Sequence, residues 1–158
     1  LTLARNEGKQ LNEGIVQDYR YDYLCIEPKI VWAPSVFFEA EYKATVSCVG
    51  GGIGEDTSLD PLWEVAQRLT LSLEFHDTEF RLSGEHFYND LSKNQHLNIW
   101  LADVSLIHKA GKWRFAASAI NLFNKEQYRY TLYSAVQSYT SWIKLRPREF
   151  MVSVQYQW

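Results

Sequence analysis

The feature that most constrains this chain is a hydrophobic period of two residues, which recurs along most of its length. From Val36 to Cys48 every second side chain is apolar or aromatic, and most side chains between them are charged or carry a hydroxyl group. Residues 69–76, 80–85 and 150–158 show the same alternation. Because successive side chains of a β-strand point to opposite faces, the pattern predicts strands with one apolar and one polar face. No segment has a convincing helical period, so we predict an all-β fold.

The connections between the predicted strands alternate between short and long. In an antiparallel meander, alternate connections lie at opposite ends of the sheet, so one end would carry tight turns and the other longer loops. This is the layout of an outer-membrane barrel. We predict an antiparallel up-and-down meander of about eight long strands over residues 1–158, forming part of a transmembrane β-barrel. The predicted short turns are residues 32–36, 76–79 and 108–112, and the predicted longer connections are residues 7–14, 50–61, 88–95 and 133–138.

The last two predicted strands are long. Residues 112–134 and 138–158 each read as one strand of about 20 residues, whereas a tilted strand crosses a bilayer in about 10. Such strands would extend well beyond the membrane on one side. Residues 17–32 and 95–108 are also strand-like, although their phase is less clean, and residues 1–6 read as a partial strand.

Composition excludes several classes of function. The net charge of −3 gives no basic field, so we expect no nucleic-acid partner. No run of about 18 apolar residues is present, so no helix is expected to span a membrane. The aromatic share of 15% suits interfaces such as the two edges of a bilayer. Trp32, Trp113 and Trp158 fall near the predicted short-turn end, which favours an aromatic girdle there.

We find no pattern typical of a catalytic, cofactor or metal site, and we predict that the chain is not an enzyme. The stretch Gly50–Gly54 lacks the spacing of a phosphate-binding loop, and we interpret it as a flexible loop tip. The four histidines form no close ligand pair, so we expect them to face solvent or a barrel lumen. Cys25 and Cys48 are expected to be free thiols. Glutamates on polar phases would line a hydrated inner wall, namely Glu39, Glu41, Glu74 and Glu85.

Two stretches near the end of the sequence carry a more specific pattern. The first reads WRFAASAINLFNKEQY over residues 113–128 and holds an Asn-Leu-Phe-Asn motif followed by a Tyr. The second reads RPREFMVSVQYQW over residues 146–158, and it opens with Arg-Pro-Arg and closes on Trp. Together they resemble the C-terminal signature of TonB-dependent outer-membrane receptors, in the form without glycine in the second motif that is common in Bacteroidetes. The residues that carry this resemblance are Asn121, Leu122, Phe123, Asn124, Tyr128, Arg146, Pro147 and Arg148.

The last predicted strand has an expected role of its own. In outer-membrane proteins, a last strand with an apolar phase that closes on an aromatic residue is what the barrel-assembly machinery recognises. By this resemblance the apolar phase faces lipid and serves as the insertion signal, whereas the other phase, from Glu149 to Gln157, faces the lumen. The expected assembly signal consists of Phe150, Val152, Val154, Tyr156 and Trp158.

The resemblance also implies a function for the parent protein. Receptors of this family lie in the bacterial outer membrane and import a scarce ligand (a siderophore, vitamin, glycan or peptide) with energy supplied through TonB. Their barrels have about 22 strands, of which this chain would supply about eight. We therefore expect a C-terminal barrel segment, from a longer receptor or a split gene product, with the plug domain and N-terminal strands absent. Its expected partners are outer-membrane lipid, the assembly machinery, the rest of the barrel and plug, TonB through that plug, and an unassigned ligand. No cofactor is expected.

Two alternatives remain open at this point. A self-contained eight-stranded outer-membrane barrel with a structural or adhesion role would need a complete first strand and matched strand lengths. A soluble lipocalin-like binding barrel would turn the apolar phase inward around a small ligand, and alternation alone does not say which face is inside. The aromatic last strand and the Asn-Leu-Phe-Asn motif favour the receptor segment over both.

Overall fold

The structure, a computed structural model, describes residues 1–12, 14–54, 57–92, 95–133 and 138–158. Every regular element in these residues is a β-strand, which confirms the predicted all-β fold. Each strand is longer than the five to six residues that are usual for soluble domains. The strands are β1 Thr2–Asn12, β2 Ile15–Ile26, β3 Lys29–Ser35, β4 Phe38–Ile53, β5 Thr57–Phe75, β6 Thr78–Ser92, β7 Gln95–Ala110, β8 Trp113–Ile120, β9 Gln127–Tyr133, β10 Ser138–Lys144 and β11 Glu149–Tyr156.

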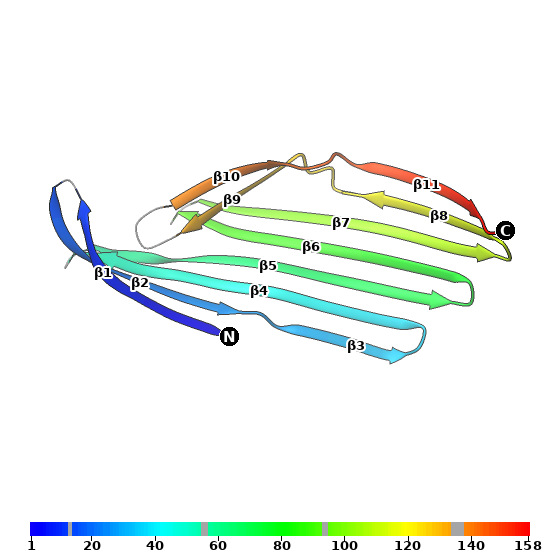
Figure 1. Ribbon diagram of the computed structural model, residues 1–158, viewed down its shortest axis with the longest axis horizontal. Coiled ribbons are helices and arrows are strands. Elements are labelled where there is room, and N and C mark those ends of the chain that lie inside the picture. Colours follow the sequence, from blue (N-terminus) through cyan, green and yellow to red (C-terminus); the bar gives the residue numbers. More distant parts are fainter. Residues whose placement is uncertain (13, 55–56, 93–94, 134–137) are drawn as a thin grey trace.

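Eight strands form the main path of one antiparallel sheet, in the order β1-β2-β4-β5-β6-β7-β8-β11 (Figure 1). β2 and β3 both pair with β4 and act as the two halves of one bent strand. The predicted antiparallel meander is therefore confirmed. The sheet is open, with β1 and β11 as edge strands, and no ladder joins them among the described residues.

The predicted longer connections are largely wrong, because the strands continue almost to the hairpin tips. β1 runs to Asn12, β4 to Ile53 and β6 to Ser92. Antiparallel pairing uses backbone groups, which polar and glycine-rich sequence can still supply, so these segments stay in the ladder. Residues 55–56, 93–94 and 134–137 lie outside the described residues, and with them most of the connection predicted at residues 133–138.

The glycine-rich stretch is also mainly strand. Residues 50–53 belong to β4, and Gly54 turns with a φ of 72°. The pairing of β4 with β5 shifts register just before Gly51, which marks a β-bulge. A Cβ atom on Gly51 would collide with the carbonyl oxygen of Arg20 on β2, whereas one on Gly50 would meet nothing within 4 Å. The close approach of two backbones explains the glycine at this bulge.

Each of the two long final strands is broken in two, which the alternation did not predict. Residues 112–134 form β8 and β9, and residues 138–158 form β10 and β11. In the first break Asn121 and Asn124 have positive φ values of 53° and 50°, a backbone conformation that interrupts a strand. In the second break Pro147 has no backbone N–H to give to a ladder. β9 and β10 pair with each other in a separate two-stranded sheet that contacts β6 and β7 (Figure 1).

The ladder registers divide the main sheet into two chemically different faces. Side chains of directly paired residues project to the same face, so a row can be followed from strand to strand. From β4 to β11 one row contains no polar side chain, and it defines the apolar face. The adjacent row, one residue away on each strand, defines the polar face. The apolar row is Ala40, Leu71, Leu82, Val104, Ala119 and Phe150, and the polar row is Glu39, Ser72, Arg81, Ser105, Ser118 and Met151.

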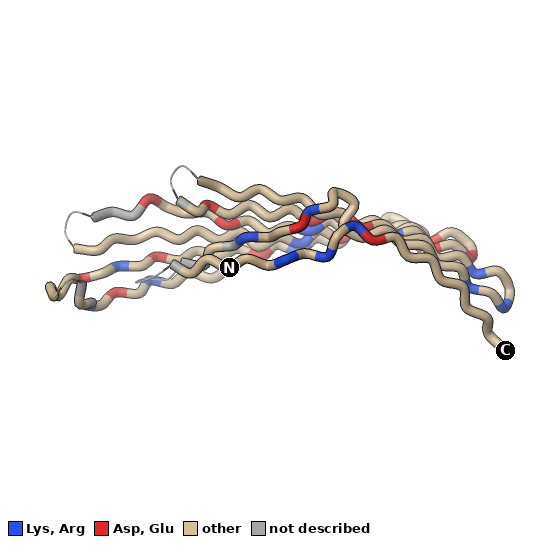
Figure 2. Tube along the Cα trace, turned by 90° about the horizontal axis from the view of Figure 1, so that it is seen from above, with Lys and Arg blue, Asp and Glu red and all other residues tan. Residues whose placement is uncertain are grey.

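The sheet is a single curved layer, with charged residues spread along its strands (Figure 2). Among the described hydrophobic residues only Cys25, Ala44, Ile99 and Ala119 are buried, and no large side chain is fully buried. The accessible surface of 11504 Å² exceeds the roughly 8,200 Å² expected for a compact monomer of 18.5 kDa. The layer therefore has almost no core of its own, and its apolar face is open to its surroundings.

Candidate functional site

The apolar face is the largest candidate functional surface. It is widely exposed, with exposed fractions of 45% for Leu73, 44% for Leu106 and 80% for Val152. Soluble monomers rarely expose a contiguous apolar patch larger than a few hundred Å². An apolar surface that crosses this many strands is therefore suited to contact with lipid or with another apolar surface.

Aromatic side chains form one rim of the apolar face, at the short-turn end of the sheet. Trp32 lies near the end of β3, Phe75 ends β5, and Trp113 begins β8. The Trp113 and Tyr156 rings are 4.8 Å apart, and the Tyr156 and Trp158 rings are 5.5 Å apart. The prediction that Trp32, Trp113 and Trp158 gather at the short-turn end is confirmed.

A row of polar side chains crosses the apolar face on β5 and β6, beside Ala44 of β4. The Tyr42 hydroxyl donates a hydrogen bond to Gln67 Oε1 at 2.7 Å. The two ring nitrogens of His86 lie 2.7 Å from Gln67 Nε2 and 3.0 Å from Asn98 Oδ1, and the ring stacks on Trp100 at 4.2 Å. His86 therefore belongs to a hydrogen-bonded row on this face and does not project from the polar face.

On β4 the apolar face continues past the row of Gln67 and His86, which lies beside Ala44. On β4 it comprises every second residue from Phe38 to Cys48, and all six are apolar or aromatic. This stretch is about 33 Å long at about 3.3 Å per residue. At the strand tilt of about 40° that is usual in membrane barrels, it gives a band about 25 Å tall, which matches their lipid-facing band.

The polar face carries paired charges. Glu41 accepts from Lys29 Nζ at 3.1 Å and from Lys43 Nζ at 2.6 Å. Arg68 pairs with Glu85 across β5 and β6. All four glutamates that the alternation assigned to the polar phase lie on this face. They are Glu39, Glu41, Glu74 and Glu85. The polar face therefore presents both carboxylates and basic side chains to its surroundings.

The described residues contain no group of three or more His, Cys, Asp or Glu side chains that could hold a metal ion. Both cysteines are free, and they lie on opposite faces, because Cys25 pairs with Ser47 and Cys48 pairs with Leu24. Within the same residues, no helix is long and apolar enough to span a bilayer.

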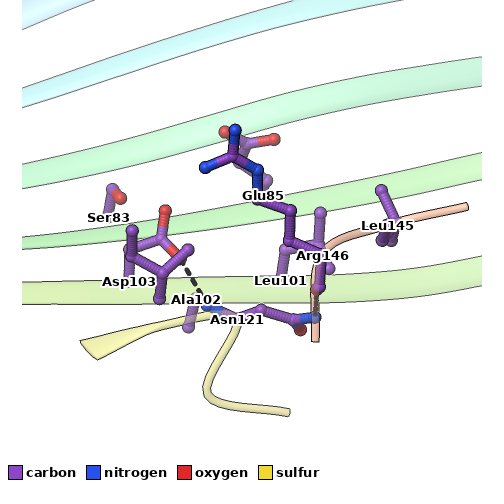
Figure 3. A pocket seen from close by; sticks show the side chains of 9 residues that line it. Ser83, Glu85, Leu101, Ala102, Asp103, Asn121, Leu145 and Arg146 are labelled. Carbon is purple, nitrogen blue, oxygen red and sulfur yellow. Dashed lines mark hydrogen bonds between the residues drawn. The ribbon is translucent and has the colours of Figure 1, made fainter. Parts of the chain in front are cut away.

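The two stretches that carry the family resemblance meet at the two strand breaks, which we call the strand-break junction (Figure 3). Asn121, only 5% exposed, is its centre. Its Nδ2 donates to the carbonyl oxygens of Lys125 at 2.8 Å and Arg146 at 2.7 Å, and its Oδ1 accepts from the Lys125 N–H at 2.9 Å. Its backbone N–H donates to Asp103 Oδ1 at 2.8 Å (Figure 3). One asparagine thus joins the first break to the second and to β7.

A second asparagine adds another link across the junction. Asn124 Oδ1 accepts a hydrogen bond from the Arg148 N–H at 2.9 Å. The Leu145 N–H donates to the Glu126 carbonyl at 3.0 Å. Because both strands leave the ladder here, these bonds satisfy backbone groups that would otherwise lack partners.

A pocket of about 200 Å³ opens beside the strand-break junction (Figure 3). Asn121, Leu145 and Arg146 line one side, and side chains of β6 and β7 line the other. Glu85 and Arg146 give it one acidic and one basic group beside the apolar Leu101. The pocket has room for several water molecules, so it suits hydration of the junction.

β9 continues from the strand-break junction onto the polar face. The Tyr128 ring packs against Phe87 of β6 with ring centroids 5.2 Å apart. The side-chain amide of Asn89, which is buried, donates to the Thr131 carbonyl and accepts from the Thr131 N–H, both at 3.3 Å. Asn89 thus supplies the two hydrogen bonds that a neighbouring strand would otherwise make.

The structure brings together some of the predicted motif residues and leaves others apart. Asn121, Asn124, Arg146 and Arg148 meet at the strand-break junction through the contacts described above. Phe123 is 57% exposed, Leu122 is half-buried and Pro147 is exposed. Sequence reasoning missed Asp103 and Asn89, because a single polar residue within a strand has no spacing that marks it as a distant partner.

Four residues of the expected assembly signal lie in β11. Phe150, Val152, Val154 and Tyr156 project to the apolar face, where they pair with Ala119, Ala117, Phe115 and Trp113 of β8. Trp158 follows the strand, and the Gln157 N–H donates to the Lys112 carbonyl at 2.8 Å. β11 is an edge strand, so its other edge is available for pairing. Recognition of these residues by an assembly machinery remains a prediction.

Comparison of the chain with models of protein families, with curated proteins and with solved structures gave no match. The features of the chain that bear on its function are the two faces of the sheet, its open edges and the motif resemblance.

Proposed function

We propose that the chain is the C-terminal part of the barrel wall of a TonB-dependent outer-membrane receptor that takes up a scarce ligand. The observation that carries this proposal is the apolar row from β4 to β11, which runs beside a polar row one residue away. A wall between lipid and a watery lumen requires this alternation. In the proposed arrangement the apolar face contacts outer-membrane lipid, and the polar face lines the lumen.

The near absence of a core supports this reading over a soluble barrel. Conformational entropy opposes folding by about 1–2 kcal/mol per residue, and burial of apolar surface is the main offset in water. With four buried hydrophobic residues in the described part of the chain, the sheet cannot supply that offset internally. Lipid against the apolar face would supply it.

The open edges of the sheet support a larger barrel. Each unsatisfied backbone N–H or C=O group costs several kcal/mol in a hydrocarbon environment. β1 and β11 both present such groups, so in a membrane each needs a partner strand. The remaining strands of a receptor barrel would provide these partners.

The proposal also orients the chain. The short-turn end with its aromatic rim would lie at the periplasmic side, and the long hairpins beyond the apolar band would lie outside the cell. β11 would present the insertion signal to the assembly machinery. Ligand import would depend on the plug and on TonB, and the transported ligand would be a siderophore, vitamin, glycan or peptide.

The test is membrane fractionation of the native host, followed by an immunoblot with an antibody against residues 138–158. The proposal predicts an outer-membrane band several times larger than 18.5 kDa. A band near 18.5 kDa in the outer membrane, shifted by heating, would instead indicate a self-contained small barrel. A band of that size in a soluble fraction would contradict both membrane proposals and favour a lipocalin-like binding protein.

A further inference from the structure

A small pocket on the polar face lies beyond the middle of the sheet, toward the long hairpins. Its volume is about 120 Å³. This equals about four water molecules at liquid density, so the pocket suits one small chemical group rather than a whole ligand. Four neighbouring strands contribute its walls: Tyr21 and Tyr23 from β2, Ser47 and Val49 from β4, Leu62, Trp63 and Glu64 from β5, and Asn89 from β6.

Glu64 sets the charge of this pocket. It pairs with Ser47 on one side and Asn89 on the other in the ladder, so the three side chains form one row. The Ser47 hydroxyl donates to Glu64 Oε2 at a long 3.4 Å. Glu41, Glu79 and Glu85 of the same face each contact a lysine or arginine, whereas no such ion pair involves Glu64 in the described part of the chain.

Aromatic rings stand beside this carboxylate. Tyr21 and Tyr23 occupy alternate positions of β2 and line the pocket together, whereas the Trp63 side chain projects to the apolar face, where Trp63 pairs with Cys48. The face of an aromatic ring attracts a cation, and carboxylates add to that attraction. An anionic group would be repelled by Glu64, and a metal ion would need more donor side chains than the pocket offers.

We propose that this pocket, which we call the Glu64 pocket, binds the ammonium head group of an organic cation. The inference rests on the proposed function, because it takes the polar face to line the lumen through which the ligand enters. It narrows the ligand class from any scarce solute to one that carries a positively charged nitrogen. Choline is a suitable probe, because its trimethylammonium group matches an aromatic wall with a single carboxylate.

The test compares choline with 3,3-dimethylbutan-1-ol, which has nearly the same shape and no charge. Binding to the full-length protein, purified from its native membrane in detergent, is measured by titration calorimetry. We expect the neutral alcohol to bind at least about tenfold more weakly than choline, as expected when a desolvated cation–π contact and a charge-assisted contact are lost. Equal affinities for the two probes, or no choline binding, would overturn the inference.

Variants test the residues of the Glu64 pocket. Glu64→Gln removes the charge at nearly constant shape and should remove the preference for choline. Tyr23→Phe keeps the ring and should retain the preference, whereas Tyr23→Leu should weaken choline binding about tenfold. Glu74→Gln is the matched control, since Glu74 lies on the same face of the same strand at the short-turn end and should change nothing. An unchanged preference in Glu64→Gln would place the site elsewhere.

The outcomes separate this inference from the proposed function. If the protein fractionates as a large outer-membrane protein but shows no preference for choline, only the inference about the Glu64 pocket is wrong. Glu64-dependent choline binding by a soluble 18.5 kDa protein would remove the receptor proposal and keep the pocket.

Discussion

Asn121 shows how one side chain can replace a missing stretch of β-ladder. Its amide group makes three hydrogen bonds to backbone atoms of both strand breaks, and its backbone adopts a φ of 53°. Asparagine tolerates this left-handed conformation better than most residues, and its amide both donates and accepts. The residue therefore meets two demands at once, one on the backbone and one on the side chain.

Asn121→Ala should lower the free energy of unfolding by about 3 kcal/mol. The substitution leaves buried backbone groups unpaired, and it keeps the left-handed backbone conformation without the side-chain hydrogen bonds that stabilise it in asparagine. Urea unfolding of the protein in phospholipid vesicles, followed by Trp fluorescence, measures this. Asn121→Gly should recover about 1 kcal/mol, because only the backbone strain is relieved. Asn124→Ala, at an exposed position with one such bond, should cost less; equal losses for both alanine variants would contradict the central role of Asn121.

Asp22 should make the β1–β2 hairpin sensitive to acid. It lies beyond the apolar band, opposite Gly50, and accepts from Arg5 Nε at 2.7 Å and Arg20 Nε at 2.8 Å. The hydrogen bond from Arg5, and then that from Arg20, hold the pKa of Asp22 below its ordinary value. A lowered pKa adds stability above the unfolded value of about 4, and this stability is lost as the pH falls through the folded value.

Arg5→Gln should therefore raise the pKa of Asp22 toward its ordinary value, and carboxyl NMR titration measures the shift. Arg81→Gln, which removes an ion pair with Glu79 at the short-turn end, serves as the control. A pKa of Asp22 that is the same in the wild-type protein and in Arg5→Gln would show that the contact is unimportant in solution.

At the scale of elements, strand breaks and a bulge set the shape of the sheet. The bulge before Gly51 lets β2 and β4 approach closely, and the two breaks let β9 and β10 leave the sheet, with β9 against β6 and β7. β11 remains in the sheet as an edge strand whose apolar side chains share a face with those of β8.

Gly51→Ala should loosen the pairing of β2 with β4 by about 1–3 kcal/mol, because the added Cβ must displace the Arg20 carbonyl group. Amide hydrogen exchange in β1 and β2 should become faster, while exchange in β7 and β8 should not change. Gly50→Ala is the matched control with open space around its Cβ. Similar exchange in both variants would refute the close-approach explanation.

Val152→Lys should impair insertion, whereas Ser153→Lys should not. The two residues are neighbours in β11, and they project to the apolar and polar faces respectively. A lysine on the lipid side of a barrel costs about 2–4 kcal/mol near the bilayer midplane, while a lumen-facing lysine is tolerated. The amount of heat-modifiable protein in the outer membrane is the readout; equal assembly of the two variants would count against β11 as a lipid-facing strand.

The sequence predicted the strands that have two clean phases and missed the features that depend on the backbone or on distant partners. Apolar and polar side chains alternate over residues 36–48 because the two faces of this strand lie in different surroundings. The pattern alone was therefore enough to predict the strand and to assign its side chains to two faces. The break at Asn121 was not, because a positive φ leaves no trace in the alternation. The contact of Asn89 with Thr131 joins positions 42 residues apart, and no spacing within the sequence indicates it.

At the scale of the whole molecule, a single curved layer separates an apolar face from a polar one (Figure 2). Its accessible surface is about 40% larger than that of a compact protein of its mass, since so little of it is buried. The aromatic rim, the membrane-sized apolar band and the open edges all have one explanation if lipid covers one face and further strands extend the sheet.

The most direct test of this account is to find which face meets lipid. A small fluorophore is attached to a single cysteine at position 71 or 72, in full-length protein from which Cys25 and Cys48 have been replaced by serine. The protein is inserted into vesicles that contain brominated lipid or are exposed to aqueous iodide. The account predicts that lipid quenches the probe at Leu71 and iodide quenches the probe at Ser72. Iodide quenching of both probes, or lipid quenching at Ser72 alone, would contradict it.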